Sequence, residues 1–464
     1  MGKIALIGGG GVRTPLLIYG LNEARKAIGA DELAIYDADL ERAKLMGRLG
    51  EIIVARAGGD LRIEVARDIA GAVEGARFVL NSIRVGGISA RARDERIALE
   101  HGYPGQETTG PGGLAMALRT IPVILQQARL VEQINPQAWF INFTNPAGLI
   151  TQALVRHTGI RAVGICDTPS ELFHRIAQSL GAPISDVQCE YFGLNHLGWV
   201  KRVLLGGEDV TTRVLASDAA LRSLYATNLF EPALIRNLGL LPTEYLFFYY
   251  ARSRALANQR AAGTTRGEEI VRMNQSLFSE LSAALQSRKP VQALEIYENY
   301  LKQRSGSYMR LEANAGSAFS EVAGLQVNPF ASATGYHRIA LEVMVALSSP
   351  IPRRILVNVR NQGAIEDLQA DDVVEVPCLA SSADIAPEPV GPLPDAVRGL
   401  ILAVKAYERA AIQAALECSV QQAQMALLLY PPVGEWAPAA ELLQALIESD
   451  PENLGYLLKP VTTS

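Results

Sequence analysis

The stretch that decides the fold is Lys3-Ile4-Ala5-Leu6-Ile7-Gly8-Gly9-Gly10-Gly11-Val12-Arg13-Thr14-Pro15. Its first five residues form an apolar run typical of a buried parallel strand. Four glycines follow, and Thr14 and Pro15 suit the cap and the first turn of a helix. Backbone amides on such a turn, with a helix N-terminus behind them, predict a binding site for a pyrophosphate.

A carboxylate follows the second predicted strand, in Ala34-Ile35-Tyr36-Asp37. At that place an acid can accept hydrogen bonds from the ribose of an adenosine and repels a 2′-phosphate, which predicts NAD rather than NADP. The predicted cofactor contacts are Gly8, Gly9, Gly10, Val12, Arg13 and Asp37. The third glycine position of G-x-G-x-x-G holds Arg13, so a tight turn without a ligand stays an alternative.

Short apolar runs alternate with helical stretches from residue 3 to about 165. The expected strands are 3–7, 33–36, 61–65, 78–81, 139–143 and 162–165. Parallel strands need crossover helices, so this rhythm predicts a Rossmann-type, doubly wound parallel sheet in an NAD-binding domain over residues 1–180. A C-terminal α+β domain for substrate, metal and oligomerisation is predicted over 181–464. Its expected elements are strands at 187–192, 199–205, 354–359 and 372–376, helices over 211–303, and a helix over 395–417 after a Pro-rich connector.

Composition excludes several classes of protein. The chain has 464 residues, 49% of them apolar, and a net charge of −5 with both signs scattered, which argues against nucleic acid as a partner. Four cysteines at 166, 189, 378 and 418 are too few and too far apart for a disulfide framework, which fits a reducing compartment. No apolar run reaches about 18 residues, so no membrane span is expected and a cytoplasmic location is predicted.

Polar residues gather where the predicted strands end. They lie in segments 81–87, 106–113, 142–147 and 164–169. Carboxyl ends of parallel strands meet at one edge of a sheet, so these segments predict a crevice for cofactor and substrate. Helix capping by Asn145 and Thr168 is the alternative. Cys166 and His196 follow neighbouring strands and together offer a soft and a borderline ligand to a divalent metal, although each alone is typical of a buried core residue.

Several motifs resemble glycoside hydrolase family 4, the NAD- and manganese-dependent glycosidases, and most closely its 6-phospho-β-glucosidase branch. The most specific are Gln-Glu-Thr-Thr-Gly-Pro-Gly-Gly at 106–113 and Asn-Pro-Ala-Gly at 145–148. Further matching stretches are 3–10, 84–87, 142–144, 193–196, 245–250, 374–377, 390–394 and 404–409. The resemblance spans nearly the whole chain and implies a fold like that of lactate and malate dehydrogenases.

The resemblance also implies a reaction that does not use the usual pair of carboxylates. NAD oxidises C3 of the sugar, a base removes the C2 proton, the C1 group leaves, water adds, and hydride returns to C3. It implies Cys166 and His196 as ligands of Mn²⁺ or another divalent metal, Tyr245 as the C2 base, and Arg266 as an arginine near the sugar. A phenol has a pKa of about 10, so Tyr245 needs nearby positive charge to act at neutral pH.

Substrate identity is where this chain departs from the family pattern. The expected contacts with a sugar, 6-phosphorylated in the leading interpretation, are Arg84, Glu107, Asn145, Asp167 and Asn195. Gly11 replaces a family Ser or Thr, Arg13 adds a cation, Asp167 replaces a common Asn, and a Tyr-rich family element reads Ala-Thr-Gly-Tyr-His-Arg at 333–338. An unphosphorylated glycoside or uronide stays an alternative.

Two other classes of function stay open from the residues alone. An NAD-dependent 2-hydroxyacid dehydrogenase would accumulate NADH and need no metal, which would leave Cys166 and His196 without a role. A non-catalytic NAD sensor would bind the cofactor without turnover. A homodimer or homotetramer is expected from the resemblance.

Overall fold

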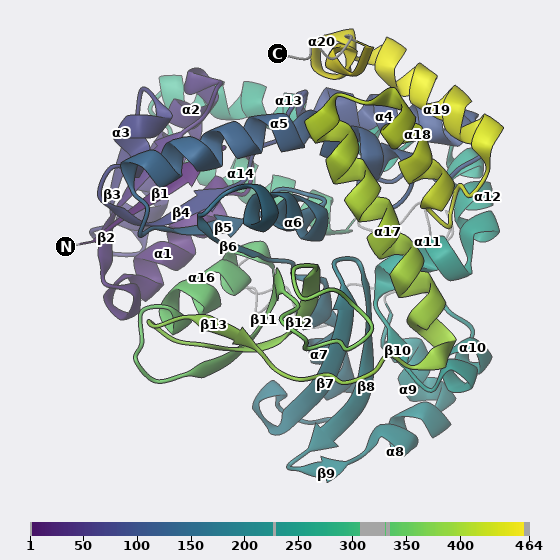
Figure 1. Ribbon diagram of the computed structural model, residues 1–464. Helices are drawn as coiled ribbons and strands as arrows, with labels where there is room; N and C mark the ends of the chain where they lie inside the picture. The colour runs from purple at the N-terminus through teal and green to yellow at the C-terminus, as the bar shows by residue number, and fades with distance from the viewer. Residues whose placement is uncertain (1, 226–228, 307–329, 331–334, 459–464) are drawn as a thin grey trace.

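The computed structural model describes residues 2–225, 229–306, 330 and 335–458, and its centre is a nine-stranded sheet (Figure 1). The strand order is β13-β12-β11-β6-β5-β4-β1-β2-β3. Its parallel strands are β1 (Gly2–Ile7), β2 (Ala30–Tyr36), β3 (Arg62–Val65), β4 (Ala76–Asn81), β5 (Trp139–Asn142) and β6 (Arg161–Gly164). The order 3-2-1-4-5-6 is that of a dinucleotide-binding fold, so the predicted fold class is confirmed.

Helices that follow the parallel strands cover both faces of this sheet, as the crossover connections require. They are α1 (Thr14–Ile28), α2 (Leu40–Arg56), α3 (Ile69–Val73), α4 (Gly87–Glu100), α5 (Pro111–Ile134), α6 (Ala147–His157) and α7 (Thr168–Ser179). The central strands are apolar and buried between them: Ile4, Leu6, Phe78 and Phe140 are each at most 2% exposed. The edge strand β3 is partly exposed. The carboxyl ends of the parallel strands therefore share one edge, where the polar segments follow.

Within the described residues, α5 is the one helix long and apolar enough to cross a membrane. The sequence was expected to contain no such segment, because α5 is interrupted by Arg119, Thr120 and two glutamines and shows no unbroken apolar run. Its most apolar window has a mean hydropathy of 1.2, and 67% of that window is buried inside the protein. That burial is typical of a core helix.

The C-terminal part of the chain extends the same sheet. Beyond β6 lie three antiparallel strands, β11 (Arg353–Arg360), β12 (Val373–Ala380) and β13 (Ile385–Pro387). The division into domains at residue 180 stays a prediction, and the sheet is common to both proposed parts.

A second, four-stranded sheet contacts β12 of the first, and most of it lies at the bottom of Figure 1. It contains β7 (Val187–Leu194), β8 (Leu197–Leu205), β9 (Glu208–Asp209) and β10 (Leu241–Pro242). The predicted strands at 187–192 and 199–205 are each two residues too short, because β7 continues to Leu194, which pairs with Leu197 at the start of β8. The hairpin turn is therefore only Asn195 and His196.

Helices make up most of the remaining described chain. They are α8 (Thr211–Ala216), α9 (Asp218–Ser223), α10 (Pro232–Leu238), η2 (Glu244–Leu246), α11 (Phe247–Tyr250), α12 (Arg252–Ala262), α13 (Arg266–Gln286), α14 (Pro290–Gly306), α16 (Tyr336–Ala346), α17 (Asp395–Glu417), α18 (Val420–Leu429), α19 (Trp436–Ser449) and α20 (Pro451–Leu454). The predicted helix over 395–417 matches α17. In Figure 1, α17 to α19 stand together on one side, next to α5 and α4.

A buried lysine ties β12 to its covering helices. Lys405, on α17, is 0% exposed, and its Nζ donates to Gln152 Oε1 at 2.9 Å and to the Val373 carbonyl at 2.6 Å. It also pairs with Glu408. Burial raises the pKa of Glu408, and the ammonium opposes that rise. The Lys405 ammonium thus joins α17 to α6 and β12 through its hydrogen bonds.

We expect Lys405→Met to lower the free energy of unfolding by about 3–5 kcal/mol, because it leaves the Glu408 carboxylate buried without its cation. Denaturant unfolding followed by circular dichroism measures this loss. Lys44→Met is the matched control: Lys44 is 51% exposed in its pair with Glu41, and its loss should change the unfolding free energy by less than about 0.5 kcal/mol. Equal losses in the two variants would contradict the assignment.

Candidate active site

The glycine turn is held by the ends of three strands. The Gly8 and Gly9 amides both donate to the Tyr36 carbonyl at 2.9 Å, and the Gly10 amide donates to Asp37 Oδ2 at 2.8 Å. Gly8 has a φ of +90°, and a Cβ there would lie 2.5 Å from the Ser82 carbonyl oxygen. The structure therefore brings together the predicted cofactor contacts Gly8 to Gly10 and Asp37, directly before α1.

The other two predicted cofactor contacts, Val12 and Arg13, contact residues from other segments of the chain. The Val12 carbonyl accepts a hydrogen bond from the Tyr297 hydroxyl at 2.8 Å. The Arg13 guanidinium lies 3.7 Å from Asp167 Oδ2 and 4.6 Å from the centre of the Tyr336 ring. Two positions at which the sequence departs from the family pattern, Arg13 and Asp167, thus meet beside Tyr336. Ala333 and Thr334, named in the same element as Tyr336, lie outside the described residues.

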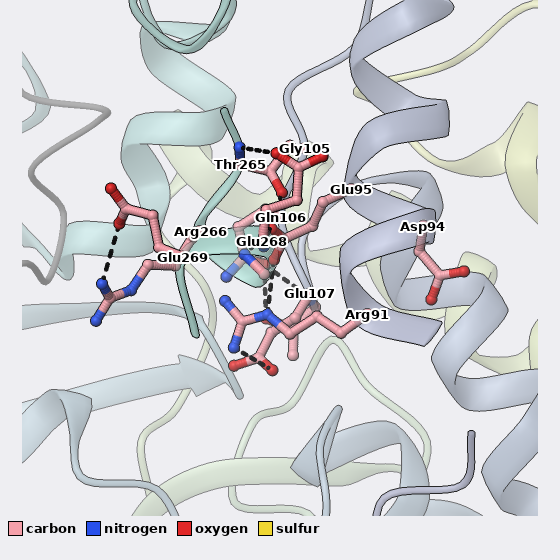
Figure 2. A network of polar contacts seen from close by, with 12 residues as sticks. Arg91, Asp94, Glu95, Gly105, Gln106, Glu107, Thr265, Arg266, Glu268 and Glu269 are labelled. Carbon is pink, nitrogen blue, oxygen red and sulfur yellow. Dashed lines mark hydrogen bonds and ion pairs between the residues drawn. The ribbon is translucent and has the colours of Figure 1, made fainter. Parts of the chain in front are cut away.

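Glu107 lies between two arginines at the same edge, and Figure 2 shows its pair with Arg91. Its Oε2 is 2.8 Å from Arg84 and 2.8 Å from Arg91. Burial raises the pKa of Glu107, but these two guanidinium groups outweigh it and lower the pKa to about 2. Glu107 and Arg84, both predicted as substrate contacts, are therefore paired with each other.

Arg91 is a site residue that the sequence analysis missed. It is 8% exposed, and its Nε donates to Glu95 Oε1 at 2.7 Å (Figure 2). The Arg91 guanidinium also interacts electrostatically with the Tyr245 side chain. Its only signal in the sequence was the i, i+4 spacing to Glu95, which is common on solvated helices.

Arg266, which was predicted to lie near the sugar, begins α13. It is 8% exposed, and its guanidinium donates to Glu269 at 3.3 Å and to the Arg304 carbonyl at 2.8 Å. Figure 2 shows the Arg266–Glu269 pair to one side of the Arg91 pairs. These contacts explain the burial of Arg266 as part of the packing of α13 against α14.

His196 is presented by the hairpin turn in a left-handed backbone conformation, with a φ of +60°. Its ring is 3% exposed and stacks on the Tyr245 ring, with centroids 3.8 Å apart and an interplanar angle of 9°. Its Nδ1 is 2.8 Å from the Thr108 hydroxyl, while Nε2 is buried and has no hydrogen-bond partner among the described residues. Burial lowers the pKa of His196 to about 4 against the pull of Glu107, so the imidazole is neutral at pH 7.

Cys166 follows β6 and is 2% exposed. Its Sγ is 3.4 Å from the Thr168 hydroxyl. Burial raises the pKa of the thiol, and the carboxylates of Glu375 and Asp167 raise it further. The described residues contain no group of three or more His, Cys, Asp or Glu side chains arranged for a metal, so Cys166 and His196 form a set of two at most.

Glu375, on β12, is a second site residue that the sequence analysis did not single out, although it lies in the quoted stretch 374–377. It is 1% exposed and accepts hydrogen bonds from Tyr191 at 2.7 Å, Asn358 at 3.0 Å and Asn195 at 3.4 Å. Burial raises the pKa of Glu375 to about 7 in spite of these donors. The predicted substrate contact Asn195 is therefore tied to a carboxyl that also acts on Cys166.

The capping alternative for Asn145 and Thr168 is wrong. The cap residue of α6 is Pro146 and that of α7 is Asp167, and neither helix has a side-chain capping bond. Asn145 is 9% exposed, and its Oδ1 is buried without a hydrogen-bond partner in the described part of the chain. An acceptor left in this condition fits a site that a ligand completes.

The pKa of Glu107 makes the stability of the site depend on pH. A carboxyl whose pKa is lowered on folding stabilises the protein above its unfolded pKa of about 4.5, and that contribution is lost as the pH falls toward 2. We expect Glu107→Gln to lower the free energy of unfolding by a constant amount above pH 5. The loss should become progressively smaller between pH 4.5 and pH 3. Denaturant unfolding at several pH values measures this; Glu41→Gln, at a position 83% exposed, should show no such trend.

Comparisons with known proteins agree with this geometry. Residues 3–182 match the family described as "Family 4 glycosyl hydrolase", and residues 191–433 match its C-terminal domain. The 6-phospho-beta-glucosidase of Escherichia coli is 33% identical, over 96% of this chain and 94% of that protein. The 6-phospho-beta glucosidase of Thermotoga maritima, solved with manganese, NAD⁺ and glucose-6-phosphate, is 29% identical with a TM-score of 0.78 and covers 98% of this chain and 99% of its own.

Similarity extends to the other anomeric class and, for the fold alone, to dehydrogenases. A 6-phospho-alpha-glucosidase from gut microorganisms, solved with NAD and glucose-6-phosphate, is 27% identical with a TM-score of 0.81 over 98% of this chain and 99% of its own. A lactate dehydrogenase from a deep-sea metagenome matches at 11% identity and a TM-score of 0.52 over 89% of this chain and 99% of its own. Since the two family matches together span most of the sequence, the chain belongs to family 4 of the glycosyl hydrolases.

Proposed function

We propose that this chain hydrolyses 6-phospho-β-glucosides, using NAD⁺ and a divalent metal, Mn²⁺ in the first instance. The observation that carries the proposal is the neutral, buried His196, with its Nε2 unpartnered among the described residues and its ring stacked on Tyr245. Full-length similarity to 6-phospho-β-glucosidases supports the substrate class. The preference for the β anomer rests on those relatives, and α-specific relatives are 25–28% identical.

The donor set fits the proposed metal. Cys166 offers a thiolate once its proton is lost, and His196 offers a neutral imidazole nitrogen. Two protein ligands leave coordination positions for the oxygens of a sugar. When bound, NAD⁺ accepts the hydride and the metal acts as a Lewis acid toward the sugar oxygens.

The glycine turn fits the proposed NAD⁺. The close approach of Gly8 to the Ser82 backbone leaves no room for a side chain, and α1 starts directly behind the turn. Asp37 already accepts the amides of Gly10 and Asp39, both at 2.8 Å. A carboxylate has about four lone-pair positions, so it retains capacity for the two hydroxyls of a ribose.

Tyr245 is proposed as the base that takes the C2 proton at its phenol oxygen. The phenolate that this step requires is stabilised by the Arg91 guanidinium, which Glu95 and Glu107 hold in place. Asn145 is proposed to accept a hydrogen bond from the sugar. Arg84, on the exposed side of Glu107, is 29% exposed and is proposed to meet the substrate phosphate.

Cleavage of p-nitrophenyl β-glucoside 6-phosphate tests the substrate and both cofactors. We expect release of p-nitrophenol only with NAD⁺ and Mn²⁺ present, no net rise in absorbance at 340 nm, and deuterium at C2 of the product formed in D₂O. The unphosphorylated glucoside and the α-linked phosphorylated substrate are the comparison substrates. Faster cleavage of either would contradict the proposed specificity.

We expect Tyr245→Phe to lower kcat by about 10²- to 10⁴-fold, because it removes the proton acceptor while keeping the stacked ring. NAD⁺ and Mn²⁺ affinities, measured by calorimetry, should stay within about twofold of wild type. Tyr249→Phe is the matched control. The Tyr249 hydroxyl shares a hydrogen bond of 2.8 Å with the Tyr430 hydroxyl and has no role in the proposed reaction. An unchanged kcat in Tyr245→Phe rules out this base.

A further inference from the structure

The segment 105–110, here called the strap, contacts His196 through Thr108 and leads into α5. Within it, Gln106 Oε1 accepts the backbone amides of Thr108 at 2.6 Å and Thr109 at 2.7 Å. The hydroxyls of Thr108 and Thr109 also lie 3.0 Å and 2.8 Å from the same atom. Because a backbone amide only donates, the atom at this position is the oxygen of the Gln106 side chain and not its nitrogen.

The Thr108 hydroxyl has a single hydrogen to donate. It lies 3.0 Å from Gln106 Oε1, which only accepts, and 2.8 Å from His196 Nδ1, which accepts or donates according to the tautomer. If the hydroxyl hydrogen points to Gln106, the hydroxyl accepts the hydrogen of Nδ1, and Nε2 has a free lone pair. If it points to Nδ1, the single hydrogen of the neutral ring is on Nε2.

We propose that Gln106 and Thr108 are positioning residues that fix His196 as its Nδ1–H tautomer and direct the Nε2 lone pair toward the metal. The metal part of this inference rests on the proposed function. The tautomer itself does not, because it follows from the hydrogen bonds of the protein alone.

The opposite tautomer is disfavoured by burial. It would place a hydrogen on Nε2, which has no acceptor among the described residues, in a ring that is 3% exposed. A buried donor without an acceptor costs about 1–3 kcal/mol. A hydrogen on Nδ1 has the Thr108 hydroxyl as its acceptor, so burial chooses the Nδ1–H tautomer.

The strap is held rigidly from both ends. A Cβ at Gly112 would lie 2.6 Å from the Gln106 carbonyl oxygen, and one at Gly113 would lie 2.2 Å from that of Thr108, so the first turn of α5 packs directly on the strap. At the other end, Gly105 exchanges two hydrogen bonds of 2.9 Å with the Gln259 side chain. Thr108 therefore cannot follow His196 if the ring rotates.

The tautomer is measured directly by long-range ¹H–¹⁵N NMR of metal-free, histidine-labelled wild-type protein at neutral pH. The chain has five histidines, and His196→Gln identifies the signal of His196 by its loss. We expect the pattern of a neutral ring protonated on Nδ1. A ring protonated on Nε2 overturns the inference, whatever the metal does.

Metal affinity gives the second readout, measured as free Mn²⁺ by electron paramagnetic resonance. We expect Thr108→Val to raise the Kd for Mn²⁺ by about 10- to 100-fold and Thr108→Ser to restore it to near wild type. Thr109→Val is the matched control, because Thr109 bonds Gln106 and has no bond to His196. A Kd in Thr108→Val equal to that of wild type overturns the positioning role.

The two proposals fail in different ways. Wild-type protein that binds no Mn²⁺ contradicts the metal site of the proposed function, and the NMR result still decides the tautomer. If Thr108→Val does not fold, Thr108→Ser and the wild-type spectrum decide the inference without it.

Discussion

The rest of the site depends on the two ion pairs of the buried Arg91 guanidinium. It lies between the carboxylates of Glu95 and Glu107, and Glu95 in turn accepts the backbone amide of Gly267 at 2.6 Å. One cation therefore joins α4, the strap and the start of α13. Removing it would leave two carboxylates at a buried position, which is a strongly unfavourable arrangement. The same charge also acts on the Tyr245 side chain.

Charge compensation also explains the unusual residues at the mouth of the site. Taken singly, Arg13 and Asp167 each look like a charge placed beside an anionic substrate. In the structure they neutralise each other across the ends of β1 and β6, and Arg13 covers the ring of Tyr336. The changes at Arg13 and Asp167 are therefore coupled, and their opposite charges leave the local net charge unchanged.

Much of the fold was predictable from the sequence, because buried parallel strands appear as short apolar runs and glycines mark the turn after β1. The edge of the sheet at which the polar segments gather was predictable for the same reason, since parallel strands end together. Contacts between side chains from distant segments were not: the pairing of Arg84 with Glu107, and the approach of Glu375 to Asn195 across 180 positions, depend on tertiary packing. Arg91 was missed because a charged residue on a helix usually lies in solvent.

The shared sheet has a consequence for synthesis of the chain on the ribosome. The edge of β6 is covered by β11, whose pairing residue Asn358 follows Gly164 by about 190 positions. At 5–20 residues per second, the parallel sheet waits on the order of 10–40 s with an open edge before its cover is made. An open strand edge is a template for aggregation, so the nascent chain depends on protection during that interval. The order in which the strands emerge from the ribosome therefore constrains the expression of this protein, although the folded sheet has no open edge at β6.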